Sequence, residues 1–249
     1  MKYLKSDSES VRKTAEALKS NKIVIIPTDT VYGFSGIVSS CPQDRAGSAR
    51  DSDCCGNSDA AVGANDVASC CDSGTDAEIR RIKGREAYKP FIQLIAAPED
   101  IKLITDDPIP DELFSLWPGA LTIIVNDKRA GAAFGAGEAS RVGEAVGAAG
   151  SGSASDCAEK PKTTVAVRCP GDAWLREVIR ETGAPIYSTS VNRSGKPVLS
   201  DIADIVAEFG KEVELIIDDG DKRNALPSTI VSVANGKCTV LRQGSVIIP

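Results

Sequence analysis

The segment IVIIPTDTVYGF, residues 23–34, joins a run of branched apolar residues to a cluster of polar ones. Such an apolar run is typical of a strand that is covered on both faces of a sheet. Pro27 cannot donate to a central ladder, so we expect the strand to end there and Thr28, Asp29 and Thr30 to lie at its exit. In α/β sheets, ligands bind at such exits. The alternative is a turn in which Asp and Thr side chains bond to nearby backbone, and the segment alone favours neither.

The chain has 249 residues, of which 42% are hydrophobic, enough for one large domain or two small ones with a full core. Its formal charge of −6 argues against a uniformly basic surface that coats nucleic acid, although a local basic groove is compatible with it. No run approaches the roughly eighteen apolar residues of a membrane span, and the start MKYLKSDSES has no signal-peptide core. We therefore expect a cytoplasmic protein whose eight cysteines are reduced.

The sequence contains no histidine. This excludes Ser-His and Cys-His nucleophilic mechanisms, histidine general bases and histidine metal ligands. The run DDGD, 218–221, could hold magnesium but is more typical of a turn, and no Walker-type or dinucleotide glycine loop is present. Any catalysis must therefore depend on charge, carboxylates, hydroxyls or lysine.

Helical and strand patterns alternate along most of the chain. This alternation indicates one α/β domain that spans residues 1–249. Two stretches interrupt it, at about 39–74 and 127–161, where small and polar residues dominate. They have too few large apolar residues to dock on a core, so we expect two flexible low-complexity insertions.

Four cysteines lie as adjacent pairs in the first insertion, at Cys54, Cys55, Cys70 and Cys71. Zinc sites usually separate paired ligands by about two to four residues, so that both sulfurs can face one ion. Adjacent cysteines do this poorly, and no histidine can complete a site. We therefore expect no metal site and a dispensable loop.

Cations follow the helix that we expect to begin near Thr75. Lys83 and Arg85 lie in KGRE, and Lys89 comes four residues later. A planar Arg fork and a Lys point charge suit a triphosphate or a carboxylate, but the same spacing fits a solvated basic face. Arg168 ends the strand TVAVR on the face that it shares with Thr164. A charge at that position indicates either a ligand site or a salt bridge at the rim of the sheet.

Hydroxyl, amide and cationic side chains mark the ends of further strands. Ser190 and Asn192 share one face of STSVN, where an ordinary turn is the alternative, and Ser200 fits the N-cap of the next helix. Ser228 starts the strand in LPSTIV, and Arg242 ends the last strand in LRQG.

Six segments occur in the order found in the YrdC/TsaC-like threonylcarbamoyl-AMP synthases, which this chain resembles. They are IIPTDTVYGF, KGREAYKPFIQLI, LWPGALTIIV, TVAVRCP, STSVNRSGKPV and PSTIV followed by LRQG. The resemblance covers nearly all of the chain outside the insertions and implies a twisted mixed sheet with a concave basic groove. It also implies synthesis of threonylcarbamoyl-AMP and pyrophosphate from L-threonine, bicarbonate and ATP with Mg²⁺. A partner transferase would then modify the tRNA adenosine next to the anticodon.

The resemblance implies roles for individual residues. The catalytic cations would be Lys83 and Arg85. The L-threonine contacts would be Thr30, Arg168, Ser190 and Ser228. The ATP contacts would be Arg85, Lys89, Thr164, Asn192, Ser200 and Arg242. Because the carbamate oxygen attacks the α-phosphorus, positioning and charge stabilisation suffice, and a chain without histidine is consistent with this chemistry.

The chain departs from this family at two points. Leu94 or a neighbour stands where some relatives carry a histidine that touches threonine. The chain also ends soon after LRQG, without the C-terminal domain of longer members, so we expect a lid to come from elsewhere or to be absent. Two other functions fit the same groove. One is RNA binding, and the other is carbamoyl-AMP formation, as in related hydrogenase-maturation proteins that carry further acylphosphatase-like and zinc-finger regions.

Overall fold

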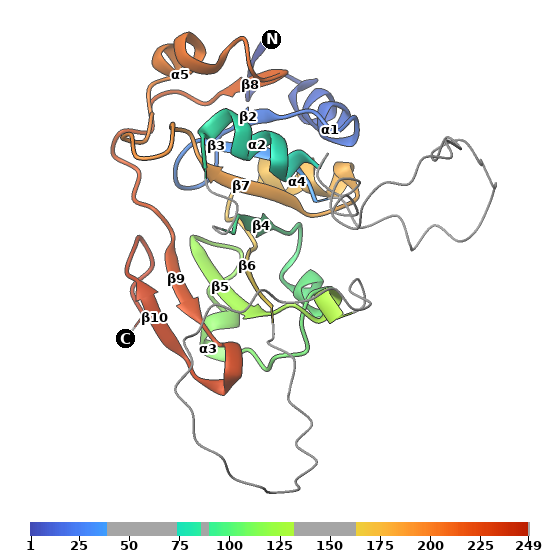
Figure 1. The fold of residues 1–249 in the computed structure, drawn as a ribbon, viewed down its shortest axis with the longest axis vertical. Helices are drawn as coiled ribbons and strands as arrows, with labels where there is room; N and C mark the ends of the chain where they lie inside the picture. Colours follow the sequence, from blue (N-terminus) through green and yellow to red (C-terminus); the bar gives the residue numbers. More distant parts are fainter. Residues whose placement is uncertain (39–73, 86–89, 132–162, 249) are drawn as a thin grey trace, which may run out of the picture.

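The computed structural model describes residues 1–38, 74–85, 90–131 and 163–248, and these form a mixed sheet flanked by helices (Figure 1). The strand order is β1-β8-β2-β3-β7-β4-β6-β5-β9-β10. The strands are β1 (Lys2–Leu4), β2 (Val24–Ile26), β3 (Gly33–Ile37), β4 (Ile92–Leu94), β5 (Leu121–Asn126), β6 (Thr164–Arg168), β7 (Ile186–Ser190), β8 (Leu215–Asp218), β9 (Thr229–Ser232) and β10 (Thr239–Arg242). The helices are α1 (Ser10–Lys19), α2 (Thr75–Lys83), α3 (Asp111–Phe114), α4 (Ala173–Thr182) and α5 (Ile202–Phe209). The predicted α/β class with a mixed sheet is confirmed.

Strand β2 is buried on both faces, as its sequence predicts. Val24 and Ile26 pack in the core cluster that contains side chains of α1 and α4, whereas Ile25 packs in the cluster that contains side chains of α2 and α5. All three residues are 0% exposed. The strand ends at Ile26, directly before Pro27. The polar residues that follow therefore emerge from the middle of the molecule rather than from an edge.

A separate core lies under β5, β6 and β9, in the lower half of Figure 1. Leu121, Ile123, Val167 and Val231 from these strands pack with Trp117, which follows α3. Strand β4 joins this half of the sheet to the other, because it pairs antiparallel with β7 and parallel with β6. The exit of β2 lies beside the end of β7, because Ile26 pairs with Gly33 and Gly33 pairs with Ser190. Strands β6 and β7 run in opposite directions, so Arg168 at the end of β6 lies level with Ile186 at the start of β7.

Both predicted insertions leave and re-enter the described structure at neighbouring points. Thr75 Oγ1 donates to Ile37 O at 2.5 Å, and Asp127 N donates to Thr163 O at 2.8 Å. Most of each insertion, including the paired cysteines, lies outside the described residues. Lys128–Gly131, at the start of the second, form a 3-10 turn.

Two local predictions have different outcomes. Ser200 as the N-cap of α5 is wrong, because Asp201 occupies that position and its Oδ1 accepts from Ala203 N at 2.8 Å. The DDGD run forms the predicted turn, in which Asp218 Oδ1 accepts from Gly220 N at 2.9 Å and Gly220 has φ +75°. The described part of the chain contains no helix long and apolar enough to cross a membrane.

Candidate functional site

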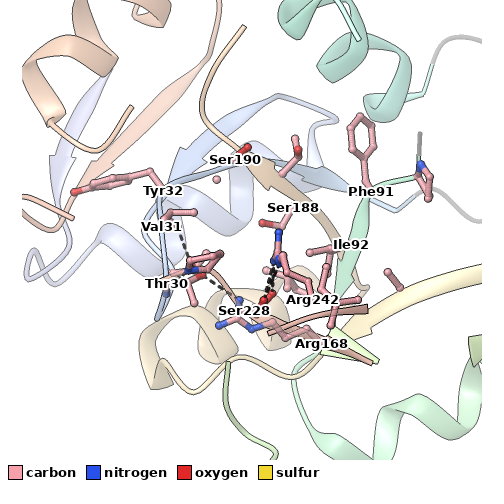
Figure 2. A pocket seen from close by; sticks show the side chains of 18 of the residues that line it. Thr30, Val31, Tyr32, Phe91, Ile92, Arg168, Ser188, Ser190, Ser228 and Arg242 are labelled. Carbon is pink, nitrogen blue, oxygen red and sulfur yellow. Dashed lines mark hydrogen bonds between the residues drawn. The ribbon is translucent and has the colours of Figure 1, made fainter. Parts of the chain in front are cut away.

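A cavity of about 430 Å³ lies beside the exit of β2, over the face of the sheet formed by β4, β6 and β7 (Figure 2). Apolar side chains of the sheet, hydroxyls and three arginines line it. The lining residues are Thr28, Thr30, Val31, Tyr32, Gly33, Arg85, Pro90, Phe91, Ile92, Leu94, Ile124, Ala166, Arg168, Ser188, Thr189, Ser190, Pro227, Ser228, Ile230 and Arg242. No described lining residue is acidic. The lining therefore attracts a ligand that carries negative charge.

Arg168, the last residue of β6, is held by acceptors from two other segments. Its Nη2 donates to Asp29 Oδ1 at 2.5 Å, and its Nε donates to Gly119 O at 3.1 Å. The second carboxylate oxygen of Asp29 accepts from Gly171 N at 2.9 Å. The Arg168 side chain is 5% exposed and that of Asp29 is 19% exposed. The ion pair is thus largely desolvated, which fixes the direction of the guanidinium at the cavity.

Thr30 continues this network. Its Oγ1 accepts from Arg168 Nη1 at 3.1 Å and lies 2.8 Å from Thr28 Oγ1. Thr28 Oγ1 already donates its one proton to Val31 O at 2.8 Å, so Thr30 must be the donor between the two hydroxyls. Thr30 therefore has one lone pair left toward the cavity. The polar exit of β2 is both a satisfied turn and part of the cavity lining.

Ser228, directly before β9, and Arg242, the last residue of β10, form a second group at the cavity. Arg242 Nη2 donates to Ser228 O at 2.8 Å, and Thr122 Oγ1 lies 3.0 Å from Ser228 Oγ. Figure 2 shows Arg242 and Ser228 in contact beside Arg168. Desolvation and the charge of Arg168 lower the pKa of Arg242. An anion bound between the two guanidiniums would relieve this repulsion.

Arg85 approaches the cavity from the residues after α2. Gly84 ends the helix with φ +62°, and Arg85 Nη1 then donates to Thr189 Oγ1 and Nη2 to Pro90 O, both at 3.0 Å. The guanidinium carbon lies 5.0 Å from the centre of the Phe91 ring. Burial and the charge of Arg80 lower the pKa of Arg85. Its Nε is buried with no hydrogen-bond partner among the described residues.

Lys83 reaches the end of β7 rather than the cavity. Its Nζ donates to Ser190 O at 2.5 Å, to Asn192 O at 3.0 Å and to Asn192 Oδ1 at 2.9 Å. It also lies 5.4 Å from the centre of the Phe34 ring. Burial and the charge of Arg85 lower the pKa of Lys83 to about 8.

The structure brings together six of the predicted site residues at the cavity. These are Thr30, Arg85, Arg168, Ser190, Ser228 and Arg242. The predicted residues Lys83, Thr164, Asn192 and Ser200 are described but do not line it. Lys89 lies outside the described residues. The ligand assigned to each residue stays a prediction.

Three residues without a predicted role take part in the site. Asp29 and Thr122 support Arg168 and Ser228, and Ser188 lines the cavity directly. For Ser188 the signal was the alternation of STSVN, which puts it on the same face as Ser190. For Asp29 and Thr122 the partners are too distant in sequence for any local pattern to reveal them.

The sheet and the cavity define an α/β protein with an arginine-lined ligand site. Sequence comparison gives the family. The Sua5/YciO/YrdC family model, described as "Telomere recombination", matches residues 67–244, more than half of the chain. The chain belongs to this family.

Named relatives agree with this assignment at low identity. Threonylcarbamoyl-AMP synthases from Bacillus subtilis and Pyrococcus abyssi are 26% and 27% identical to it, over 98% and 94% of this chain. The aligned parts cover 56% and 54% of those relatives, so the chain spans about half of their length. The structure of P. abyssi Sua5 complexed with L-threonine has a TM-score of 0.62 at 24% identity, over 96% of this chain and 55% of that one. That similarity shows the same fold.

Proposed function

We propose that the chain catalyses formation of L-threonylcarbamoyl-AMP and pyrophosphate from L-threonine, bicarbonate and ATP. The observation that carries the proposal is the cavity, which sets Arg85, Arg168 and Arg242 around hydroxyls with no described carboxylate in the lining. The relatives named threonylcarbamoyl-AMP synthase support the same reaction.

The substrates would divide between the three arginines of the cavity. Arg168, with Thr30, Ser190 and Ser228, would hold L-threonine, because a guanidinium with a fixed direction can pair with a carboxylate. Arg85 and Arg242 would face the phosphates of ATP, whose charge would compensate their lowered pKa values. Mg²⁺ would enter with ATP as part of that substrate.

The reaction would need orientation and charge stabilisation from this chain. The threonine amine and bicarbonate first give a carbamate with loss of water. A carbamate oxygen then attacks the α-phosphorus, the new O–P bond forms, and the bond to the β-phosphate oxygen breaks to release pyrophosphate. Guanidiniums aimed at the phosphates stabilise the charge that develops in this step. Neither step requires a histidine base, which this sequence lacks.

In the cell, a downstream transferase would move the threonylcarbamoyl group to tRNA. The protein would then work in the cytoplasm beside that transferase, without a membrane. RNA binding through the same cavity is the alternative to this proposal.

The test is pyrophosphate release by the purified chain. Release should require threonine, bicarbonate, ATP and Mg²⁺ together. Release without threonine would remove the proposed substrate, and release that depends on carbamoyl phosphate would indicate a carbamoyl-AMP-forming protein. Tight, salt-dependent RNA binding without any nucleotide turnover would indicate an RNA-binding module.

A further inference from the structure

The ammonium of Lys83 has no donor left for a ligand. The residue is 3% exposed, and its three N–H groups match the three acceptors of Ser190 and Asn192 at 2.5 to 3.0 Å. An ammonium carries three donors and no acceptor. A phosphate oxygen could bind Lys83 only if one of these three hydrogen bonds broke.

Asn192 is equally saturated. Its Oδ1 accepts from Lys83 Nζ and from Ser190 Oγ, both at 2.9 Å. Its Nδ2 donates to Arg193 O at 3.0 Å and to Lys196 O at 2.7 Å. Because Lys83 can only donate, the oxygen of the amide must face Lys83 and the nitrogen must face the two carbonyls. The network therefore fixes which way the amide points.

This orientation fixes the hydroxyl of Ser190 in turn. Oδ1 of Asn192 is an acceptor, so Ser190 Oγ must donate its single proton to it. The hydroxyl then has only lone pairs for the cavity that Ser190 lines. A ligand atom that meets Ser190 must bring its own proton.

Further hydrogen bonds join the residues after β7 to the end of α2. Ser194 N donates to Lys83 O at 2.7 Å, and Arg193 Nη1 donates to Ile82 O. Arg193 also pairs with Glu208 of α5 and with Glu212. Hydrogen bonds thus connect the end of α2 to the loop after β7 at several points. These contacts restrict the position of Ser190, which directly precedes the loop.

We propose that Lys83 and Asn192 are positioning residues that lock the Ser190 hydroxyl as a hydrogen-bond acceptor. The ligand group at Ser190 is then an ammonium, an amine or a hydroxyl, and not a phosphate or a carboxylate. The identity of that ligand as L-threonine rests on the proposed function. The network itself does not depend on it.

The first experiment tests the network without any ligand. Lys83→Met, Asn192→Ala and the double variant are compared with the wild-type chain in urea unfolding. The two single losses should be strongly non-additive, because either substitution breaks the same bonds. Additive losses would overturn the network. Lys19→Met, at the exposed last position of α1, is the matched control and should leave the unfolding midpoint unchanged.

The second experiment separates the two ligands by calorimetric titration. Lys83→Met and Ser190→Ala should each weaken L-threonine binding by about tenfold, the value of one hydrogen bond, and the double variant should be no weaker than Ser190→Ala alone. ATP binding should change by less than about twofold, since no bond to a phosphate is lost.

A tenfold loss of ATP affinity with threonine binding intact would overturn the proposal. If Lys83→Met does not fold, Asn192→Ala carries the same comparison. A wild-type chain that binds neither ligand would refute the proposed function, while the unfolding cycle would still decide the network.

Discussion

Asp29 and Arg168, which lie 139 positions apart in the sequence, form a largely buried ion pair with 2.5 Å between Oδ1 and Nη2. The pair joins the exit of β2 to the end of β6, and Asp29 also accepts from Gly171 N. It explains why a polar cluster directly follows a buried strand. The Asp29 carboxylate neutralises and orients the Arg168 guanidinium, which lines the cavity.

Removal of the Asp29 charge should destabilise the fold. Asp29→Asn keeps the size of the side chain but leaves Arg168 buried without its counter-ion, and loss of one partner of a buried pair costs about 3 to 5 kcal/mol. We expect a loss near the lower bound, because Asp29 is 19% exposed. Urea unfolding measures it. Asp106→Asn is the control, because Asp106 is 80% exposed in its pair with Lys128 and should cost no more than about 1 kcal/mol. Equal effects of the two substitutions would show that the Asp29 pair is effectively solvated.

Gly33 should not tolerate a side chain while Ser188 keeps its hydroxyl. A Cβ at Gly33 would lie 2.8 Å from Ser188 Oγ, which is too close for two non-bonded atoms. Gly33→Ala should therefore cost about 1 to 3 kcal/mol of unfolding free energy, as overpacked sites do. Adding Ser188→Ala should restore most of the loss by removing the clashing atom. No recovery in the double variant would locate the strain elsewhere.

The titration of Lys83 should appear in the pH dependence of stability. Its pKa falls to about 8 in the folded chain from an ordinary value of 10.5. Between these values the unfolded chain holds a proton that the folded chain has lost, so the free energy of unfolding should rise with pH. Urea unfolding between these two pH values should show this rise in the wild-type chain relative to Lys83→Met. A difference that stays flat would mean that the ammonium keeps its proton in the folded chain.

Local sequence patterns predicted the main elements of the fold. The apolar run predicted a strand covered on both faces, and Pro27 predicted where β2 ends. Strands β1 and β3 escaped prediction. Lys2–Leu4 has only three residues, and Gly33–Ile37 contains two glycines, which are depleted in strands. Both strands are stabilised by pairing with strands that lie elsewhere in the sequence. A local pattern holds no information about those partners.

The same limit applies to the site. Arg168 could be selected because a charge at the end of a buried strand is unusual, and the structure places it at the cavity. The support from Asp29 could not be predicted, because it depends on how distant strands align. Lys83 illustrates the opposite case, since a helix-end lysine beside Arg85 suggests a phosphate site. In the structure its Nζ instead donates to three acceptors of Ser190 and Asn192, and its catalytic role stays a prediction.

Arg85 should be required for turnover rather than for folding. If it faces the phosphates, Arg85→Ala should cost about 2 to 4 kcal/mol of transition-state stabilisation, the range for an aligned charged donor. L-threonine binding should change much less. Pyrophosphate release and threonine titration measure the two effects. Arg81→Ala is the control, because Arg81 is 63% exposed and pairs with Glu78 of the same helix, so it should have no effect on turnover. A fall in thermal stability large enough to account for the lost activity would point to a structural role for Arg85.

Residues 39–73 should be replaceable by a short Gly/Ser link. The two ends of the segment already meet, because Thr75 Oγ1 donates to Ile37 O at 2.5 Å and a Cβ at Gly36 would lie 2.6 Å from Thr75 Cβ. A few residues can therefore close the gap without moving β3 or α2. Loop-closure entropy changes by only about 0.6 kcal/mol for each doubling of loop length, so the free energy of unfolding should change little.

Pyrophosphate release by this shortened chain should stay within a few-fold of that of the full chain, because α2 would still deliver Lys83 and Arg85 to the same positions. The matched change is replacement of residues 132–162, whose flanking strands also meet, through Asp127 N and Thr163 O at 2.8 Å. Stoichiometric zinc in protein purified without added metal, together with loss of activity in the first deletion only, would show that the cysteine pairs belong to a functional element. If both deletions fold and only the first loses threonine or ATP binding, the segment contributes to the cavity instead.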